Sequence, residues 1–452
     1  ATAVRPRLPT GAGSHQNPGA HTRCGNGPVS VDAPPSGAPT VTDNGIDLPV
    51  ADRWVQRRVS IIWGLVFLNV LAFRGGSPNL VLPLSKIAGE LITGGALVLA
   101  LLLAVSLNRR LEIRPNVVLT LATILAGIAL AVSLLGGAGV GAVIRSVRLI
   151  GFLAVLWLLT PWWGRRDLHL VRCHLRAVIE ICATVIVGFL IHPTVALSGG
   201  GQHRLVGILW PIPAPQVAEY AALAAGMSLI LWLSGRMPRN PALFVAGAGT
   251  LMVLATETRT ALIALVVAVA CAAATLFVTN SRVRRVVAIT AIVVPIAALA
   301  LFPVFSIWFN RHQSSAERSG LTGRKQVWDG LLAAPRPEFN RWFGFGLSDK
   351  SFGGLSIDST WLALYQDEGL IGDAVVAATL AILLIAPYFR PSGPARAVAT
   401  FLVVYCVIAS YTEVGLGDAS PYVLSIVVAA SLVASRRRRG PTGAGLTAAE
   451  LP

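Results

Sequence analysis

The sequence has few charged residues, and most of its length is apolar. Charged residues make up 13% of the 452 positions and hydrophobic residues 54%, and the mean hydropathy is +0.68. A water-soluble domain carries roughly 25% charged residues, so the composition excludes an ordinary soluble enzyme or binding module. Apolar stretches of about twenty residues recur along the chain, long enough to cross the hydrocarbon core as helices. The sequence therefore predicts a polytopic, all-α membrane protein.

Cysteine and clustered acidic residues are also scarce. The chain has five cysteines; Cys24 lies near the N-terminus, and the other four lie in or beside apolar runs. No pair of cysteines has the spacing of metal ligands, and buried thiols in such runs usually act as small packing residues. The segments expected on the outer face contain no closely spaced pair of aspartates that would demand a metal. We expect no metal and no cofactor.

The net charge of +16 does not indicate a nucleic-acid-binding protein. The arginines mark the ends of apolar runs and form no separate basic domain, so membrane lipids are the expected partners. Residues 1–50 are rich in Gly, Pro, Thr and Asn and contain no apolar core of a signal peptide, so they predict a disordered cytoplasmic tail.

The apolar runs predict a transmembrane bundle of about twelve helices. The bundle comprises nine helices within 51–308, a large extracytoplasmic loop at 309–358 that contains short helices, three helices within 359–435, and a cytoplasmic tail at 436–452. The predicted spans are 59–73, 87–107, 117–136, 147–163, 175–192, 216–234, 241–256, 260–278, 286–308, 359–389, 397–412 and 420–435.

The distribution of arginine predicts the orientation in the membrane. If the N-terminus is cytoplasmic, twenty arginines lie at the inner ends of the helices, against six Arg or Lys residues in the short outer loops. Cytoplasmic loops carry such an excess of Arg and Lys. We therefore expect a multi-pass protein of the plasma membrane with both termini in the cytoplasm and the 309–358 loop outside.

Five polar or aromatic residues stand out on the predicted outer face. Arg204 precedes an apolar helix in "GGGQHRLVGILWPIP", and Arg259 lies in the tight turn "LATETRTALIAL". Arg324 and Trp328 are four residues apart, so a helix would place them on one face. Asp358 opens the segment "DSTWLALYQ" and is suited either to catalysis or to capping the helix. Contact with lipid headgroups or solvent is the alternative interpretation for the arginines.

Three further residues are weaker candidates. Glu219 lies near the outer end of its helix, where it could line a site. Arg145 and Arg148 lie at the outer end of another helix, where contact with lipid is favoured over contact with substrate. His203 is interpreted as a plain loop residue.

Arginines that converge at a membrane surface favour an anionic, lipid-linked substrate. A guanidinium forms bidentate, charge-assisted hydrogen bonds to phosphate oxygens. Several of them suit a diphosphate, whose charge increases as the bond to a transferred sugar breaks. An enzyme that faces outward meets no cytosolic sugar nucleotide, so the expected donor is a polyprenyl-diphosphate-linked glycan.

The sequence resembles the O-antigen ligase and O-antigen polymerase superfamily of polytopic glycan-assembly proteins. The resemblance lies mostly within 199–390, in the order "HRLVGILWPIP", "TETRTALIAL", "GLTGRKQVWDGLLAAP" with "WFGFGLS", and "DSTWLALYQDEGLIG". It implies a metal-independent glycosyltransferase for cell-envelope polysaccharide, with a glycan or glycolipid acceptor. It also implies that Arg204, Arg259 and Arg324 bind the donor diphosphate.

Asp358 departs from the pattern, because ligases of this superfamily carry a histidine at that position. A carboxylate can still act as general base, and direct displacement at the anomeric carbon would then invert its configuration. The departure favours a polymerase or another transferase over a ligase.

Two other classes of function fit a polytopic protein. A transporter or flippase of lipid-linked glycan predicts two similar halves with polar groups near the midplane, and the sequence shows no convincing repeat between 59–234 and 241–435. A non-catalytic subunit of an envelope-synthesis complex is also consistent with the sequence.

Overall fold

The computed structural model describes residues 50–71, 81, 85–136, 139–163, 168–197, 204–310, 324–348 and 350–434. Several predicted features lie outside these residues. They are most of the N-terminal tail, the C-terminal tail, His203 and residues 311–323 of the large loop. The described residues are almost entirely helical, so the predicted fold class of a helical membrane protein is confirmed.

The chain forms helices throughout, with one short hairpin. The elements are α1 Val50–Val70, α2 Lys86–Leu107, α3 Val117–Leu135, α4 Val140–Leu159, η1 Thr160–Trp162, α5 His169–Ile191, α6 Pro193–Ala196, α7 Ala214–Leu233, α8 Arg239–Ala255, α9 Arg259–Phe277, α10 Ser281–Asn310, α12 Arg324–Ala333, α13 Glu338–Phe343, β1 Ser351–Phe352, β2 Leu355–Ser356, α14 Thr360–Asp367, α15 Gly369–Ile385, η3 Ala386–Phe389, α16 Pro394–Ala409 and α17 Pro421–Ala434.

Seven of these helical segments are long and apolar enough to cross a membrane by length and composition. They are α2, α3, α4 with η1, α5, α7, α9 and α15 with η3, while α8, α16 and α17 are shorter apolar helices. Each of the twelve predicted ranges overlaps at least one helix. The count of about twelve crossing helices stays a prediction.

The predicted span 359–389, which is long enough to start as a non-spanning helix, forms two helices because the chain breaks at Glu368. Helix α14 ends at Asp367 and α15 begins at Gly369, which has a φ of +67°. A Cβ atom at Gly369 would lie 2.4 Å from the backbone of Trp342. Glycine is therefore required there for both its conformation and its size. The polar residues Gln366, Asp367 and Glu368 lie at this break.

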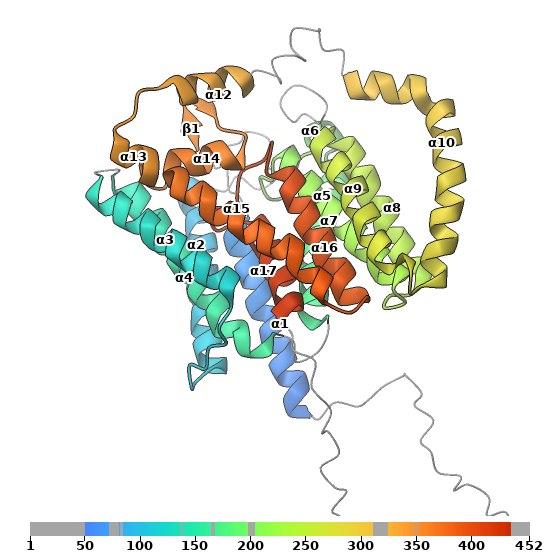
Figure 1. Ribbon diagram of the computed structural model, residues 1–452, viewed down its shortest axis with the longest axis horizontal. Helices are drawn as coiled ribbons and strands as arrows, with labels where there is room; N and C mark the ends of the chain where they lie inside the picture. Colours follow the sequence, from blue (N-terminus) through green and yellow to red (C-terminus); the bar gives the residue numbers. More distant parts are fainter. Residues whose placement is uncertain are drawn as a thin grey trace, which may run out of the picture. The chain divides into compact units, whose positions relative to one another are not determined.

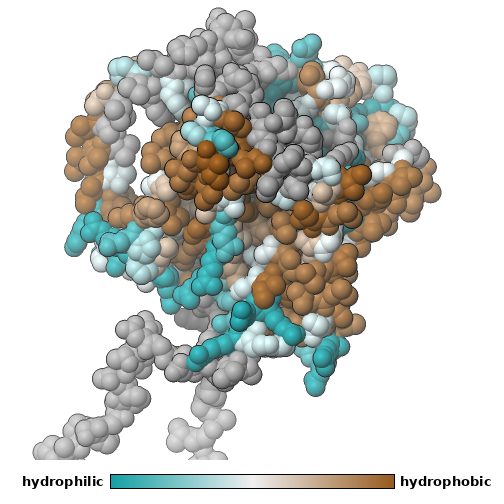
Figure 2. All heavy atoms as spheres, turned by 180° about the vertical axis from the view of Figure 1, so that it is seen from behind, coloured by the Kyte–Doolittle hydropathy of each residue, from teal (hydrophilic) through white to brown (hydrophobic). Residues whose placement is uncertain are grey.

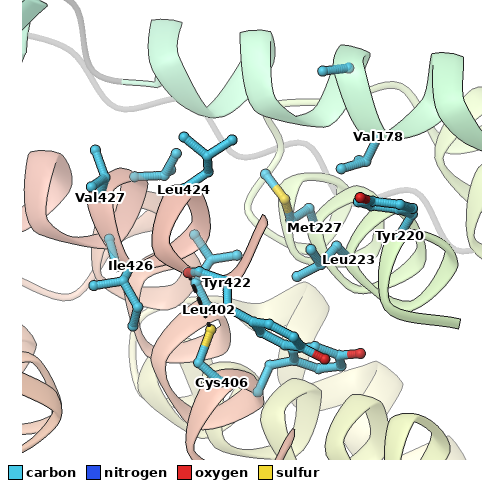
Figure 3. Close-up of a cluster of buried hydrophobic side chains, with 14 of the residues drawn as sticks. Val178, Tyr220, Leu223, Met227, Leu402, Cys406, Tyr422, Leu424, Ile426 and Val427 are labelled. Carbon is cyan, nitrogen blue, oxygen red and sulfur yellow. Dashed lines mark hydrogen bonds between the residues drawn. The ribbon is translucent and has the colours of Figure 1, made fainter. Parts of the chain in front are cut away.

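Helix α7 lies at the centre of the bundle. In its apolar window 83% of the residues are buried, and it contacts α5, α8, α9 and α16. Small residues permit this close packing. Gly249 of α8 lies against Ala221 and Ala225 of α7, and Gly226 of α7 faces the ring of Phe401 of α16. Figure 3 shows side chains of α5, α7, α16 and α17 meeting in this core.

Other helices expose their apolar side chains. In the windows of α2 and of α15 with η3, 28% of the residues are buried. Leu91 and Leu102 of α2 are examples of large hydrophobic residues that are more than 60% exposed. Figure 2 shows hydrophobic side chains covering wide areas of the helical surface. Such surfaces suit contact with lipid chains.

The short elements between α10 and α15 lie together at one end of the bundle (Figure 1). Helix α12, the antiparallel hairpin β1–β2 and α14 share a small hydrophobic core of Val327, Leu331, Ile357 and Ala363. This core is separate from the large core of the bundle. We call this end of the molecule, with α12, the hairpin and α14, the site end.

The packing of α7 on α8 predicts the effect of a substitution. A Cβ at Gly249 would lie 2.6 Å from the carbonyl oxygen of Ala221, so we expect Gly249→Ala to cost about 1–3 kcal/mol through overpacking. Thermal unfolding in detergent measures this. Gly247→Ala on the same helix is the control, because its Cβ would meet nothing within 4 Å. Equal unfolding temperatures for the two variants would contradict the close packing of α7 on α8.

Candidate functional site

Arg204 is bonded to the turn between α8 and α9. Its Nε donates to the carbonyl oxygen of Thr256 at 2.9 Å, and its Nη2 donates to Oγ1 of Thr258 at 3.1 Å. The backbone N–H of Leu205 donates to the carbonyl of Ala255 at 3.0 Å, so main chain and side chain dock together. Arg204 is therefore held against the segment that leads directly into Arg259.

The turn itself is tight. Glu257 adopts a φ of +51°, which is uncommon for a residue other than glycine, and its N–H donates to the carbonyl of Leu254 at 3.1 Å. Thr258 is the N-cap of α9 and Arg259 is its first residue. The turn brings Arg259 within one residue of the hydroxyl that Arg204 binds. Two of the three predicted arginines thus come from neighbouring backbone.

Arg324 is paired with Asp358. The two residues come from the start of α12 and the segment before α14, and Arg324 Nε lies 3.3 Å from Asp358 Oδ2. The side chains are 26% and 41% exposed, so the pair is open to a ligand. Asp358 is not the N-cap of α14. Ser359 holds that position, and it makes no capping hydrogen bond through its side chain.

Trp328 anchors α12 to the chain between α16 and α17. Its ring meets the ring of Tyr411 edge-on, with centroids 5.6 Å apart. Trp328 also packs against the small core at the site end. Arg324 and Trp328 lie four residues apart on the same helix, α12, as the sequence predicts. The tryptophan packs against its neighbours there.

Residues 410–420, between α16 and α17, form a part of the site that we did not predict. Thr360 donates its N–H to the carbonyl of Ser410 at 3.0 Å and its Oγ1 to the carbonyl of Glu413 at 2.6 Å. Thr412 Oγ1 donates to Thr260 Oγ1 at 2.8 Å. This segment, which we call the α16–α17 loop, therefore connects α14 with the start of α9.

Glu413 of this loop lies within electrostatic reach of three predicted site residues. They are Arg324, Asp358 and Arg204. The pKa of Glu413 is raised to about 7, mainly by burial and to a lesser degree by Asp358, whereas Arg324 and Arg204 oppose the shift. Burial lowers the pKa of Arg204, and the charge of Arg324 lowers it further. Glu413 and Glu257 oppose this shift. Arg204, Arg324, Asp358 and Glu413 thus form one charged cluster.

Sequence patterns provided one signal for Glu413. The stretch "YTEVGLGDAS" interrupts two apolar helices with polar and glycine residues, on the outer side in the predicted topology. It lies beyond the motifs that carry the family resemblance. Its proximity to Arg204 and Arg324 depends on tertiary contacts across more than eighty residues of chain, which no local pattern contains.

The other predicted residues lie outside the charged cluster. Arg145 donates to the carbonyl of Leu347 at 3.3 Å, and Arg148 donates to the carbonyl of Asn69. Both arginines therefore hold backbone of other segments in place. Glu219 is 1% exposed in α7, beneath the site and within electrostatic reach of Glu413.

A second group of charges stabilises the junction of α14 and α15. Lys350 and Asp367 form a buried ion pair, and the N–H of Ser348 donates to Asp367 Oδ1 at 3.1 Å. Burial opposes the charge on Lys350, but Asp367, Asp418 and Glu368 outweigh it and raise its pKa. Burial also raises the pKa of Glu368. This group holds the segment after α13 against the bundle.

Among the described residues, no group of three or more His, Cys, Asp or Glu side chains is arranged to hold a metal ion. The charged cluster instead contributes guanidinium groups, which bind anions.

One family comparison bears on this arrangement. Residues 242–368 match the family described as O-Antigen ligase. The match supports membership of the chain in the O-antigen ligase superfamily, as the sequence motifs predict. No curated protein matches the chain.

The residues that match the family contain part of the charged cluster. Arg324 and Asp358 lie within them, whereas Arg204 and Glu413 lie before and after them. The cluster is therefore assembled from the matched residues and from both flanking segments.

The raised pKa of Glu413 predicts a pH dependence of stability. The usual value of 4.5 applies to the unfolded chain and about 7 to the folded protein, so the neutral carboxyl is favoured by folding. Its contribution is full below about pH 4.5 and is lost as pH rises through about 7. We expect the unfolding temperature of the wild type to fall over this range relative to Glu413→Gln. Parallel curves for the two proteins would contradict the buried position of Glu413.

Proposed function

We propose that the protein is a membrane glycosyltransferase that moves a glycan from a polyprenyl diphosphate to a glycan or glycolipid acceptor. The O-antigen ligase domain supports a membrane enzyme that transfers glycans in envelope polysaccharide assembly. The observation that carries the proposal is the cationic cluster at the site end. Arg204 is bonded to the turn that precedes Arg259, and it lies within electrostatic reach of Arg324.

The proposed role of these arginines is to bind the donor diphosphate. Each guanidinium presents several N–H donors to phosphate oxygens. When the bond between the sugar and the phosphate breaks, the leaving diphosphate gains negative charge. Cations that are already in place stabilise that charge more than they stabilise the bound donor, so they lower the barrier.

The position of the cluster supports a lipid-linked donor. It lies at the end of apolar helices, where the headgroup of a membrane lipid would lie, and beside the short helices of the 309–358 loop. The excess of arginine at the predicted inner ends of the helices favours the extracytoplasmic face for this loop. The proposed donor is therefore presented from the outer leaflet.

The proposed chemistry is direct displacement at the anomeric carbon, with inversion of its configuration. The acceptor hydroxyl attacks as the diphosphate leaves, and a carboxylate of the cluster takes the proton. The family resemblance implies that this transfer needs no metal, in which case Arg204, Arg259 and Arg324 neutralise the diphosphate. Asp358 is paired with Arg324, and Glu413 lies within electrostatic reach of Arg324 and Arg204.

Loss of one arginine predicts weaker donor binding. We expect Arg324→Ala to weaken the binding of undecaprenyl diphosphate by about 10–100-fold, because one charge-assisted contact contributes about 1.5–3 kcal/mol. Microscale thermophoresis with the full-length protein in lipid nanodiscs measures the affinity. Lys325→Ala is the control, since Lys325 is the neighbouring exposed cation. If both variants bind as the wild type does, the diphosphate role of Arg324 is wrong.

A further inference from the structure

The charged cluster contains two carboxylates, and their surroundings differ. Asp358 directs one oxygen at the guanidinium of Arg324, at 3.3 Å, from a backbone position just before α14. A carboxylate in this arrangement fixes the direction of the arginine side chain, as outer-shell partners of binding groups do. Asp358 is therefore suited to orient Arg324 toward an anion.

Glu413 is held more firmly by its backbone. Its N–H donates to the carbonyl of Ala409 at 2.9 Å, and its own carbonyl accepts from Thr360 Oγ1 at 2.6 Å. The adjacent Thr412 is bonded to Thr260, two residues from the Thr258 hydroxyl that Arg204 contacts. Glu413 is thus fixed between the start of α14, which follows Asp358, and the start of α9, which follows the turn that Arg204 binds; a catalytic group needs such fixed backbone.

We infer that Glu413 is the general base that takes the proton of the acceptor hydroxyl, and that Asp358 is a positioning residue for Arg324. This inference rests on the proposed glycosyl transfer. Charged and titratable groups face Glu413 from every element packed around it: Arg204, Glu219, Arg324, Asp358, Tyr405 and Tyr422. Two of them are cations that attract its carboxylate form, and two are carboxyl groups that disfavour it.

The step conserves atoms and charge. The acceptor oxygen forms a bond to the anomeric carbon while its proton passes to the carboxylate of Glu413. The bond between the anomeric carbon and the phosphate oxygen breaks, and its electron pair leaves with the polyprenyl diphosphate, which the arginines hold. The protonated Glu413 then releases its proton to water. A base with a pKa of about 7 balances availability against strength near neutral pH.

The experiment compares two carboxylate-to-amide variants in the same assay. The full-length protein in nanodiscs is given the membrane-lipid extract of the cells that naturally make it, which supplies the native donor. Mass spectrometry follows the release of polyprenyl diphosphate between about pH 5.5 and pH 8.5, and a parallel measurement follows binding of undecaprenyl diphosphate. Asp329→Asn, an exposed carboxylate on α12, is the matched control.

We expect the wild-type rate to rise with pH around about 7 and Glu413→Gln to lower turnover by about 100–10,000-fold with unchanged binding. Glu413→Asp keeps a carboxylate, so we expect it to retain a pH-dependent rate. For Asp358→Asn we expect weaker binding with the pH midpoint unchanged. Asp329→Asn should match the wild type.

Three results distinguish a failure of the proposed glycosyl transfer from a failure of the proposed general base. If the wild type releases no polyprenyl diphosphate, the proposed transfer is wrong and the base with it. If the wild type is active and Glu413→Gln keeps its rate and pH midpoint, the base is wrong and the transfer stands. If Asp358→Asn removes the pH dependence while binding is kept, Asp358 is the base instead.

Discussion

The charged cluster depends on the docking of the α16–α17 loop against two other parts of the chain. The loop accepts hydrogen bonds from Thr360 at the start of α14, and Thr412 bonds Thr260 at the start of α9. On the far side of that turn, Arg204 binds Thr256 and Thr258. These threonine contacts are short and partly buried, so water does not compete for them freely. They fix the backbone that carries Arg204 and Glu413.

The sequence was sufficient to predict the membrane class, the position of most helices and three segments of the site. These features depend on apolar runs and on the placement of arginine, which are local properties. The break at Glu368 depends on the contact of Gly369 with the backbone of Trp342, which lies in a separate element and is not visible in a local pattern. The position of Glu413 in the charged cluster was missed because its neighbours come from distant elements. The N-cap interpretation of Asp358 was off by one residue, an error that no propensity resolves.

The residues that match the O-antigen ligase family are not all the residues that the charged cluster needs. The matched residues end at Glu368, whereas the charged cluster needs Arg204 from before them and Glu413 from after them. A fragment limited to 242–368 would keep the Arg324–Asp358 pair and lose the loop that positions it. It would also lose α7, the most buried of the seven long apolar helices. The charged cluster therefore needs parts of the bundle that lie outside the matched residues.

The lengths of the last two helices determine how deep the cluster lies. Helices α16 and α17 have 16 and 14 residues, or about 24 and 21 Å, whereas α5 has 23 residues and measures about 35 Å. The loop that joins the two short helices contains the buried residues Thr412, Leu416 and Ser420. One added turn in α16 would lift Glu413 by about 5.4 Å toward water. Helix length thus sets the dielectric environment of the carboxylate.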